Sequence, residues 1–236
     1  MSRANPRQLA LALGHAESFA REDFLSGPSN AAALATIERW PDWPAQAMVL
    51  VGPEGCGKSH LAAIWAEAAG ARFLAARALA GDGLPGALAT GALVVEDIAP
   101  EALDERALFH LLNLAREERA FVLFTARTAP SGWTIGLRDL ASRLRALPVV
   151  TLGAPDDALL RAVLVKLFGD RQLAADESLI GYLANRIERS VAAARAIVAE
   201  LDREAMRQKR PLSRPLAAEV LRQTLGKPVT SSSAEA

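Results

Sequence analysis

The chain has 236 residues, of which 51% are hydrophobic, and its 27 basic side chains balance its 27 acidic ones. This composition excludes a disordered chain and predicts one sizeable core, or a main domain with a smaller one attached. No apolar run reaches the roughly 18 residues needed to cross a bilayer, residues 1–13 lack the pattern of a secretion signal, and zero net charge provides no overall attraction to nucleic acid. We therefore expect a cytoplasmic protein that makes no contact with a membrane.

The single cysteine, Cys56, has no disulfide partner, and the three histidines do not fall at metal-ligand spacings with it. A structural zinc site is therefore not expected.

Short apolar runs alternate with helical periodicity through the first two thirds of the chain. The expected strands cover 48–51, 72–75, 92–95, 121–124 and 149–152, and the expected helices cover 30–40, 60–69, 102–118 and 137–147. Residues 81–91 contain four glycines and a proline and are expected to be irregular. The alternation predicts an α/β fold with a parallel five-stranded sheet sandwiched by helices.

Strand patterns are lacking after residue 152. Four amphipathic helices are expected there, over 156–168, 176–187, 190–208 and 215–225, and they predict a small all-helical lid domain. The expected organisation is an N-terminal arm (1–23), a nucleotide-binding α/β domain (24–153), the lid (154–226) and a flexible tail (227–236).

A glycine-rich loop lies directly between the first strand and the helix that follows it. Its sequence is Gly52-Pro53-Glu54-Gly55-Cys56-Gly57-Lys58-Ser59. The spacing places backbone N–H groups around phosphate oxygens, with Lys58 reaching the outer phosphates and Ser59 offering its hydroxyl to Mg²⁺. This loop predicts a phosphate site for ADP or ATP. Within it, Cys56 is expected to be a small packing residue rather than a redox group.

Acidic residues end the apolar strand 92–95. Nucleotide hydrolysis needs a carboxylate that holds the metal and an acid that orients the attacking water, and Glu96 and Asp97 supply both. The expected Mg²⁺ site therefore comprises Ser59, Glu96 and Asp97. The alternative is that the two acids merely end a strand in solvent. Thr125, at the end of the strand 121–124, could hydrogen-bond the water or the outer phosphate, although a threonine is ordinary at that position.

These motifs, taken in order, resemble the AAA+ module of the bacterial replication initiator DnaA. The matching segments are Phe24-Leu25-Ser26-Gly27-Pro28-Ser29-Asn30, the loop through His60, Glu96-Asp97, Thr125, and Leu140-Ala141-Ser142-Arg143-Leu144, within residues 8–225. DnaA proteins follow this module with a helix-turn-helix domain, and this sequence ends after the lid. The resemblance therefore points to the Hda family of shorter DnaA homologues, the DnaA regulatory inactivators.

The N-terminal arm resembles the peptide by which that family docks on the sliding clamp, the β subunit of DNA polymerase III. The segment is Gln8-Leu9-Ala10-Leu11-Ala12-Leu13, in which Leu9, Leu11 and Leu13 would enter an apolar groove while Gln8 makes polar contacts. A helix start is the competing interpretation. Contact with DNA would be only indirect, through the clamp.

The resemblance implies a regulator that, once loaded on the clamp, stimulates ATP hydrolysis by DnaA and prevents over-initiation. It implies nucleotide contacts from Leu25, Asn30 and His60. It also implies that Arg143 is an arginine finger acting on the partner's nucleotide, and that Asp97 and Thr125 are the other catalytic positions. The alternatives for Arg143 are a surface role or a role belonging to its neighbour Arg145.

The sequence departs from the family at two positions. Glu96 stands where most relatives have Asp, which puts intrinsic hydrolysis in doubt, and Ala192 stands where the lid normally carries an arginine that senses nucleotide. Arg195, one helical turn further on, is expected to substitute unless it is a solvated surface residue.

Two other functions compete with this one. A DnaA-related DNA-remodelling ATPase, such as a helicase loader, would need a basic or aromatic stripe, and neutral charge with 5% aromatic residues offers little of either. A small-molecule phosphotransferase could use the same loop, but the helical lid and the placement of Arg143 argue against it.

Overall fold

Five short apolar strands pair into one sheet in the computed structural model, which describes residues 19–80 and 83–225. The strands are β1 (Ala47–Val51), β2 (Arg72–Ala75), β3 (Ala92–Ile98), β4 (Phe121–Ala126) and β5 (Val149–Thr151). Every pairing is parallel, and the order across the sheet is β2-β3-β4-β1-β5. The predicted parallel five-stranded sheet is therefore confirmed.

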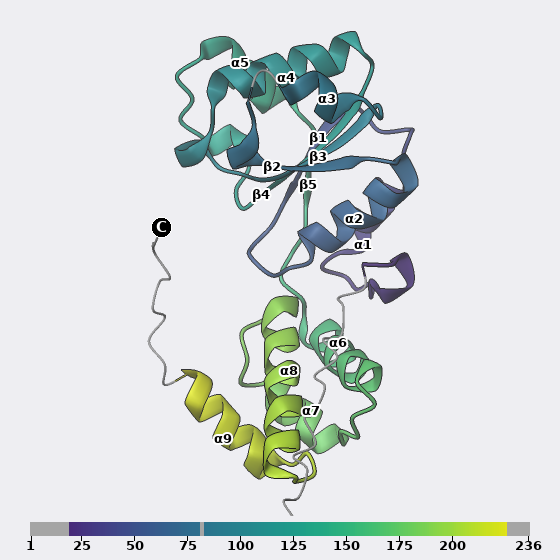
Figure 1. Ribbon diagram of the computed structural model, residues 1–236, viewed down its shortest axis with the longest axis vertical. Coiled ribbons are helices and arrows are strands. Elements are labelled where there is room, and N and C mark those ends of the chain that lie inside the picture. Colours follow the sequence, from purple (N-terminus) through teal and green to yellow (C-terminus); the bar gives the residue numbers. More distant parts are fainter. Residues whose placement is uncertain (1–18, 81–82, 226–236) are drawn as a thin grey trace, which may run out of the picture.

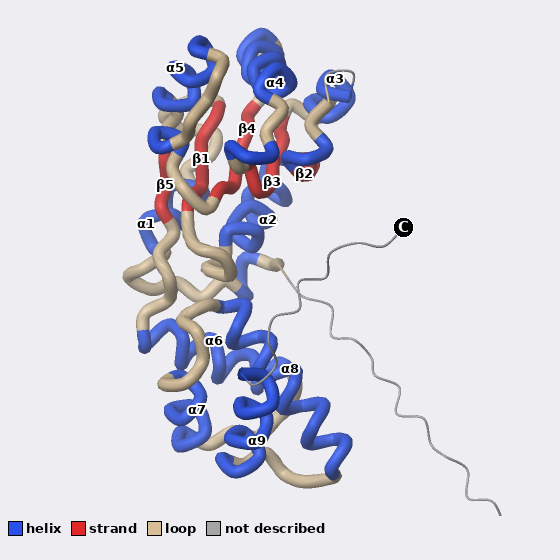
Figure 2. The backbone as a smooth tube through the Cα atoms, turned by 90° about the vertical axis from the view of Figure 1, so that its left-hand side faces the viewer, coloured by secondary structure: helices blue, strands red, loops and turns tan. Residues whose placement is uncertain are grey.

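Helices cover both faces of this sheet, and the alternation of side chains along β1 shows why. Met48 and Leu50 belong to one apolar core, whereas Val49 and Val51 belong to a second core on the opposite face. Figure 2 shows the two helix layers on either side of the red strands. One layer contains α1 (Ala31–Glu38) and α2 (Lys58–Ala69), and the other contains α3 (Leu84–Leu88), α4 (Glu105–Glu117) and α5 (Arg138–Ala146).

The lid is a separate helical layer with a third apolar core, and it lies below α1 and α2 in Figure 1. It consists of α6 (Asp157–Asp170), α7 (Glu177–Ala184), α8 (Val191–Gln208) and α9 (Arg214–Leu225). Asp156 and Asp176 cap α6 and α7, and Ser190 caps α8 by accepting the N–H of Ala193 at 3.0 Å. The predicted all-helical lid is confirmed.

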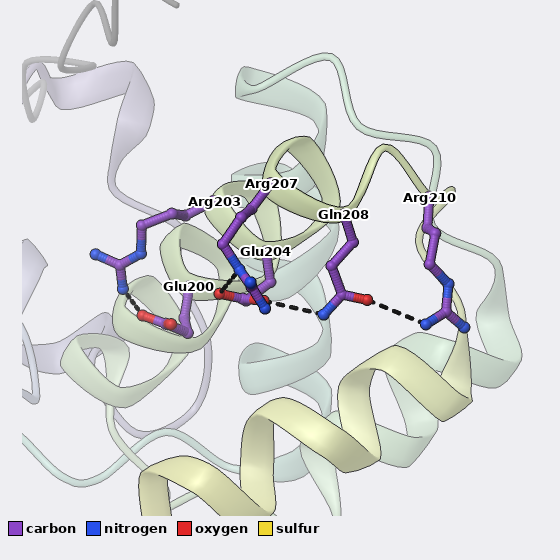
Figure 3. Close-up of polar contacts among 6 residues, drawn as sticks. All are labelled: Glu200, Arg203, Glu204, Arg207, Gln208 and Arg210. Atoms are coloured by element: carbon purple, nitrogen blue, oxygen red, sulfur yellow. Dashed lines mark hydrogen bonds and ion pairs between the residues drawn. The ribbon is translucent and has the colours of Figure 1, made fainter.

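Polar contacts fix the far end of α8 (Figure 3). The buried carboxylate of Glu204 accepts hydrogen bonds from Arg207 at 2.7 Å and from Gln208 at 3.0 Å. The amide oxygen of Gln208 in turn accepts from Arg210 at 3.0 Å, and Glu200 pairs with Arg203. These contacts satisfy the charges around the turn into α9, so they have a structural role.

Three segments differ from the sequence predictions. β3 continues through Glu96 and Asp97, because the strand kinks instead of ending: its register with β4 shifts between Val95 and Ile98, and Asp97 has a φ of 55°. The segment 81–91 contains α3, which forms because Leu84 and Leu88 are buried against the sheet. α4 begins later than predicted, after Asp104, whose side chain caps it.

Two predicted segments lie outside the described residues, namely the clamp-binding residues Gln8, Leu9, Leu11 and Leu13 and the tail 227–236. Within residues 19–80 and 83–225, every helix is too short or too polar to span a bilayer.

The burial of β4 at the centre of the sheet predicts a large loss of stability on truncation of Phe124. Its side chain is 0% exposed, so Phe124→Ala should lower the free energy of unfolding by about 3–5 kcal/mol. Phe73 is 48% exposed on the edge strand β2, and Phe73→Ala is the matched control, with an expected change within about 0.5 kcal/mol. Urea unfolding measures both, and similar losses in the two variants would contradict this packing.

Candidate nucleotide-binding site

The loop between β1 and α2 has a backbone that requires glycine at three positions. Gly55 and Gly57 have φ angles of 70° and 107°, in the left-handed region that disfavours side chains. A Cβ atom at Gly52 would lie 2.4 Å from the carbonyl oxygen of Leu152. With Gly57 as its N-cap and no side-chain cap, α2 directs the N–H groups of its first turn toward this loop. The loop can therefore surround an anion with backbone donors.

Lys58 supplies the positive charge of the loop. Its side chain is buried, and its Nζ donates to the carbonyl oxygens of Gly52 at 2.9 Å and Pro53 at 2.8 Å. No carboxylate among the described residues pairs with it, so only dipoles compensate this buried ammonium group. A phosphate group would complete its environment, so the residues present fit the predicted ligand.

Cys56 points into the apolar core beneath α1 and α2. Burial raises the pKa of its thiol, while the nearby charge of Lys58 acts in the opposite direction. A buried, protonated thiol is a poor nucleophile, which is consistent with a packing role.

The predicted acidic residues lie at the same edge of the sheet as the loop, but they differ in exposure. Asp97 is exposed and lines the cavity described below, whereas Glu96 is half-buried and is not among the lining residues. Thr125 is buried, and its Oγ1 accepts the backbone N–H of Asp97 at 3.0 Å. In this structure Thr125 therefore orients the kinked backbone at Asp97, and its contact with a water or phosphate stays a prediction.

The described residues contain no group of three His, Cys, Asp or Glu side chains suited to a metal ion. A Mg²⁺ ion at this loop would draw its ligands mainly from the Ser59 hydroxyl, phosphate oxygens and water, with Asp97 and Glu96 on the adjacent strand. The metal role of these three residues remains a prediction.

Residues of the loop and of the lid together line a cavity of about 940 Å³. Residues from six segments of the chain line it, and they include most of the predicted contact residues: Leu25, Asn30, Glu54, Gly55, Cys56, Gly57, Lys58, Ser59, His60, Asp97 and Arg195. Asn30 shapes the segment before α1, because its Oδ1 accepts the N–H of Gly27 at 2.8 Å and its Nδ2 donates to the Leu25 carbonyl at 2.9 Å. Gly52 and Pro53 lie at the back of the loop, where they hold Lys58.

The lid touches the phosphate loop directly at the start of α8. The carbonyl of Gly55 accepts the N–H of Val191 at 2.8 Å and that of Ala192 at 3.4 Å. A Cβ atom at Gly55 would lie 2.8 Å from the Cβ of Ala192, so Gly55 has no room for a side chain in this arrangement. Ala192 and Arg195 both line the cavity, as expected for positions one helical turn apart.

Sequence reasoning missed several residues of the cavity wall, among them Phe19, Arg127 and Lys166. Lys166 pairs with Asp23 at 2.7 Å and with Asp170 at 2.9 Å, and its hydrogen bonds to these carboxylates raise its pKa. The sequence indicates only the pair of Lys166 and Asp170, which are four residues apart on α6. The contact of Lys166 with Asp23 joins segments that are distant in sequence.

Arg143 lies on α5, in the helix layer on the opposite face of the sheet from α1 and α2, and it does not line the cavity. Its guanidinium lies 4.8 Å from the centre of the Phe109 ring on α4. The Nε of Arg145 instead donates to the Ala141 carbonyl of its own helix at 3.1 Å. Arg143 therefore lies apart from the predicted nucleotide contacts that line the cavity, and its role toward a partner's nucleotide stays a prediction.

The α/β domain, the glycine-rich loop and the helical lid together define an AAA+ fold. No family model and no curated protein sequence matches the chain. Domain III of the replication initiation protein DnaA from Thermotoga maritima is similar in structure, with a TM-score of 0.70 at 16% identity, over 89% of this chain and 98% of that one.

Two further solved structures show the same likeness. AMPPCP-bound DnaA from Aquifex aeolicus matches with a TM-score of 0.64 at 16% identity, covering 84% of this chain and 68% of that one. A RuvB variant from Thermotoga maritima matches with a TM-score of 0.67 at 16% identity, covering 88% and 72%. The chain thus shares the fold of the AAA+ modules of DnaA and RuvB.

His60, in the first turn of α2, joins the loop to the segment before α1. Its Nε2 lies 3.0 Å from the Ala20 carbonyl oxygen, to which the neutral ring donates when Nε2 carries the proton. Burial lowers the pKa of His60; the Ala20 carbonyl opposes this shift. The charges of Arg195 and Lys166 lower the pKa further, and Asp23 raises it.

This lowered pKa predicts a pH-dependent stability. Below about pH 6.5, His60 becomes protonated in the unfolded chain but stays neutral in the folded chain, because its pKa is lower there. The free energy of unfolding therefore falls as the pH falls from about 6.5 toward the folded-state pKa. His60→Gln should remove this part of the dependence, as measured by urea unfolding between about pH 7.5 and pH 5.5.

The exposed residue His110 provides the control, since His110→Gln should leave the dependence in place. An equal loss of stability on acidification in wild type and His60→Gln would contradict the interpretation.

Proposed function

We propose that the chain binds ADP or ATP in the cavity between its two domains and regulates replication initiation by stimulating ATP hydrolysis on a DnaA partner. The observation that carries the first part is the buried Lys58, which only carbonyl dipoles compensate, beside the open N-terminus of α2. Both features favour an anion with several oxygens, and phosphate has that chemistry.

The likeness to known structures supports nucleotide as the ligand. The similar DnaA from Aquifex aeolicus was solved with AMPPCP, an ATP analogue, and a further similar DnaA was solved with AMPPCP and single-stranded DNA. Mg²⁺ would accompany the phosphates at Ser59, as in other loops of this kind.

The regulatory part of the proposal rests on Arg143 and on the arm. The contact of the Arg143 guanidinium with the Phe109 ring uses no hydrogen-bond acceptor, and no described carboxylate pairs with Arg143. Arg143 is thus suited to meet the γ-phosphate of a neighbour. In this proposal the segment Gln8–Leu13, which lies outside the described residues, docks on the sliding clamp and brings Arg143 to DnaA.

A DNA-remodelling ATPase is the second candidate, favoured by the similar DnaA solved with single-stranded DNA. Tight, salt-sensitive binding of single-stranded oligonucleotides by the chain alone would favour it over the regulator.

Removal of the Lys58 charge tests nucleotide binding. Lys58→Ala should weaken ADP binding about tenfold to hundredfold, because a hydrogen bond between charged groups contributes about 1.5–3 kcal/mol. Isothermal calorimetry gives the dissociation constants, and Arg116→Ala, which removes an exposed charge on α4, should leave them unchanged. If wild type and Lys58→Ala bind ADP equally, the cavity is not a nucleotide site of the proposed kind.

Arg143 and Arg145 form a matched pair that tests the regulatory role. With the cognate DnaA and the clamp loaded on DNA, Arg143→Ala should abolish stimulation of ATP hydrolysis, since an arginine finger contributes about 10³ to 10⁵ in rate. Arg145→Ala should keep most of it, because this guanidinium is bound to its own helix. Phosphate release measures both rates.

The opposite ranking of the two variants would transfer the role to Arg145, and full stimulation by both would refute an arginine finger on α5. A Gln8→Ala variant that still binds the clamp with wild-type affinity would refute docking through the arm.

A further inference from the structure

Residues 19–24, termed the strap below, run along the cavity between α2 and the lid. In Figure 1 this first described segment, in purple, lies beside α2 and above α6. Phe19, Asp23 and Phe24 all line the cavity. The strap therefore belongs to neither domain alone.

Three contacts attach the strap to α2, and all of them involve His60. The rings of Phe19 and Phe24 approach the imidazole edge-on, with centroids 5.4 Å and 5.3 Å away, and the Ala20 carbonyl lies 3.0 Å from Nε2. Aromatic pairs in this edge-to-face geometry are favourable. Because His60 directly follows Ser59, the strap is anchored at the edge of the phosphate loop.

Two further contacts attach the strap to the lid. The guanidinium of Arg195 on α8 lies 5.7 Å from the centre of the Phe19 ring, and Lys166 on α6 pairs with Asp23 at 2.7 Å. The side chains of both Lys166 and Asp23 are about three quarters shielded, so solvent screens this pair less than a surface one. These two contacts between the strap and the lid form only while α6 and α8 lie in their present position over the loop.

We propose that Phe19 is a positioning residue for Arg195, and that the strap couples the N-terminal segment to the nucleotide cavity. The inference rests on the proposed nucleotide binding. The Phe19 ring holds Arg195 at the cavity wall, so nucleotide binding between the domains and seating of the strap favour one another. Linkage requires this effect to be reciprocal. A partner that binds residues 8–13 and displaces the strap weakens nucleotide binding, and bound nucleotide opposes that displacement.

The first test is ADP affinity measured by calorimetry on the full chain. Phe19→Ala should weaken binding about fivefold, at the lower end of typical coupling between sites. Phe19→Tyr, which keeps the ring face, should restore wild-type affinity, and Phe19→Leu should not. Phe73→Ala, which removes an equally large exposed ring from the edge strand β2, should have no effect.

A double-mutant cycle separates positioning from direct contact. If Phe19 acts through Arg195, the double variant Phe19→Ala, Arg195→Ala binds ADP no more weakly than Arg195→Ala alone. Additive losses would show that Phe19 acts independently of Arg195 and would overturn the inference.

Hydrogen exchange provides a readout of the strap itself. Saturating ADP should slow amide exchange in residues 20–24 of wild type and slow it much less in Arg195→Ala at equal occupancy. If Phe19→Ala binds ADP with wild-type affinity while Lys58→Ala binds it more weakly, the coupling through the strap is refuted and the proposed nucleotide binding stands. Absence of ADP binding by wild type would refute the proposed function itself.

Discussion

The hydrogen bond from the N–H of Val191 to the carbonyl of Gly55 joins the two domains, and the geometry of the cavity depends on it. It places the first turn of α8 against the phosphate loop, at a donor–acceptor distance of 2.8 Å. Gly55 presents its carbonyl with a φ of 70°, which favours glycine. The position also needs glycine because a Cβ atom there would collide with Ala192. The cavity exists because the loop and the lid are held together at this point while α6, α8 and the strap enclose the space beside it.

Two lysines of the cavity wall differ in how the described residues compensate their charges. Lys166 has two carboxylate partners, Asp23 and Asp170, and it therefore serves to join segments of the chain. Lys58 has only carbonyl oxygens around a buried ammonium group. An electrically neutral chain, with 27 charges of each sign, thus contains a local positive site directed at the cavity. Local placement of charge, rather than net charge, makes the site suited to phosphate.

Much of the fold followed from short-range patterns in the sequence. Because Met48, Val49, Leu50 and Val51 alternate between the two cores, β1 is apolar throughout, and the strand could be predicted from that short run. The phosphate loop could be predicted for the same reason, since its chemistry depends on the spacing of neighbouring residues.

Features that depend on tertiary contacts were not predictable in this way. α3 is short and contains a proline and a glycine, and it is helical because Leu84 and Leu88 pack on the sheet. The kink at Asp97 depends on the hydroxyl of Thr125, from a neighbouring strand. Phe19 reaches the cavity only because His60, far along the chain, provides a surface for its ring. In each case the decisive partner is distant in sequence.

The central claim is that the cavity beneath the Gly55–Val191 contact holds a nucleotide whose phosphates meet Lys58. Mass spectrometry of the small molecules released when the purified protein is denatured tests this most directly, with Lys58→Ala prepared in parallel. We expect ADP or ATP in a stoichiometric amount from wild type and a large reduction from Lys58→Ala. Equal amounts from the two proteins, or none from a wild type that also fails to take up added ADP, would contradict the claim.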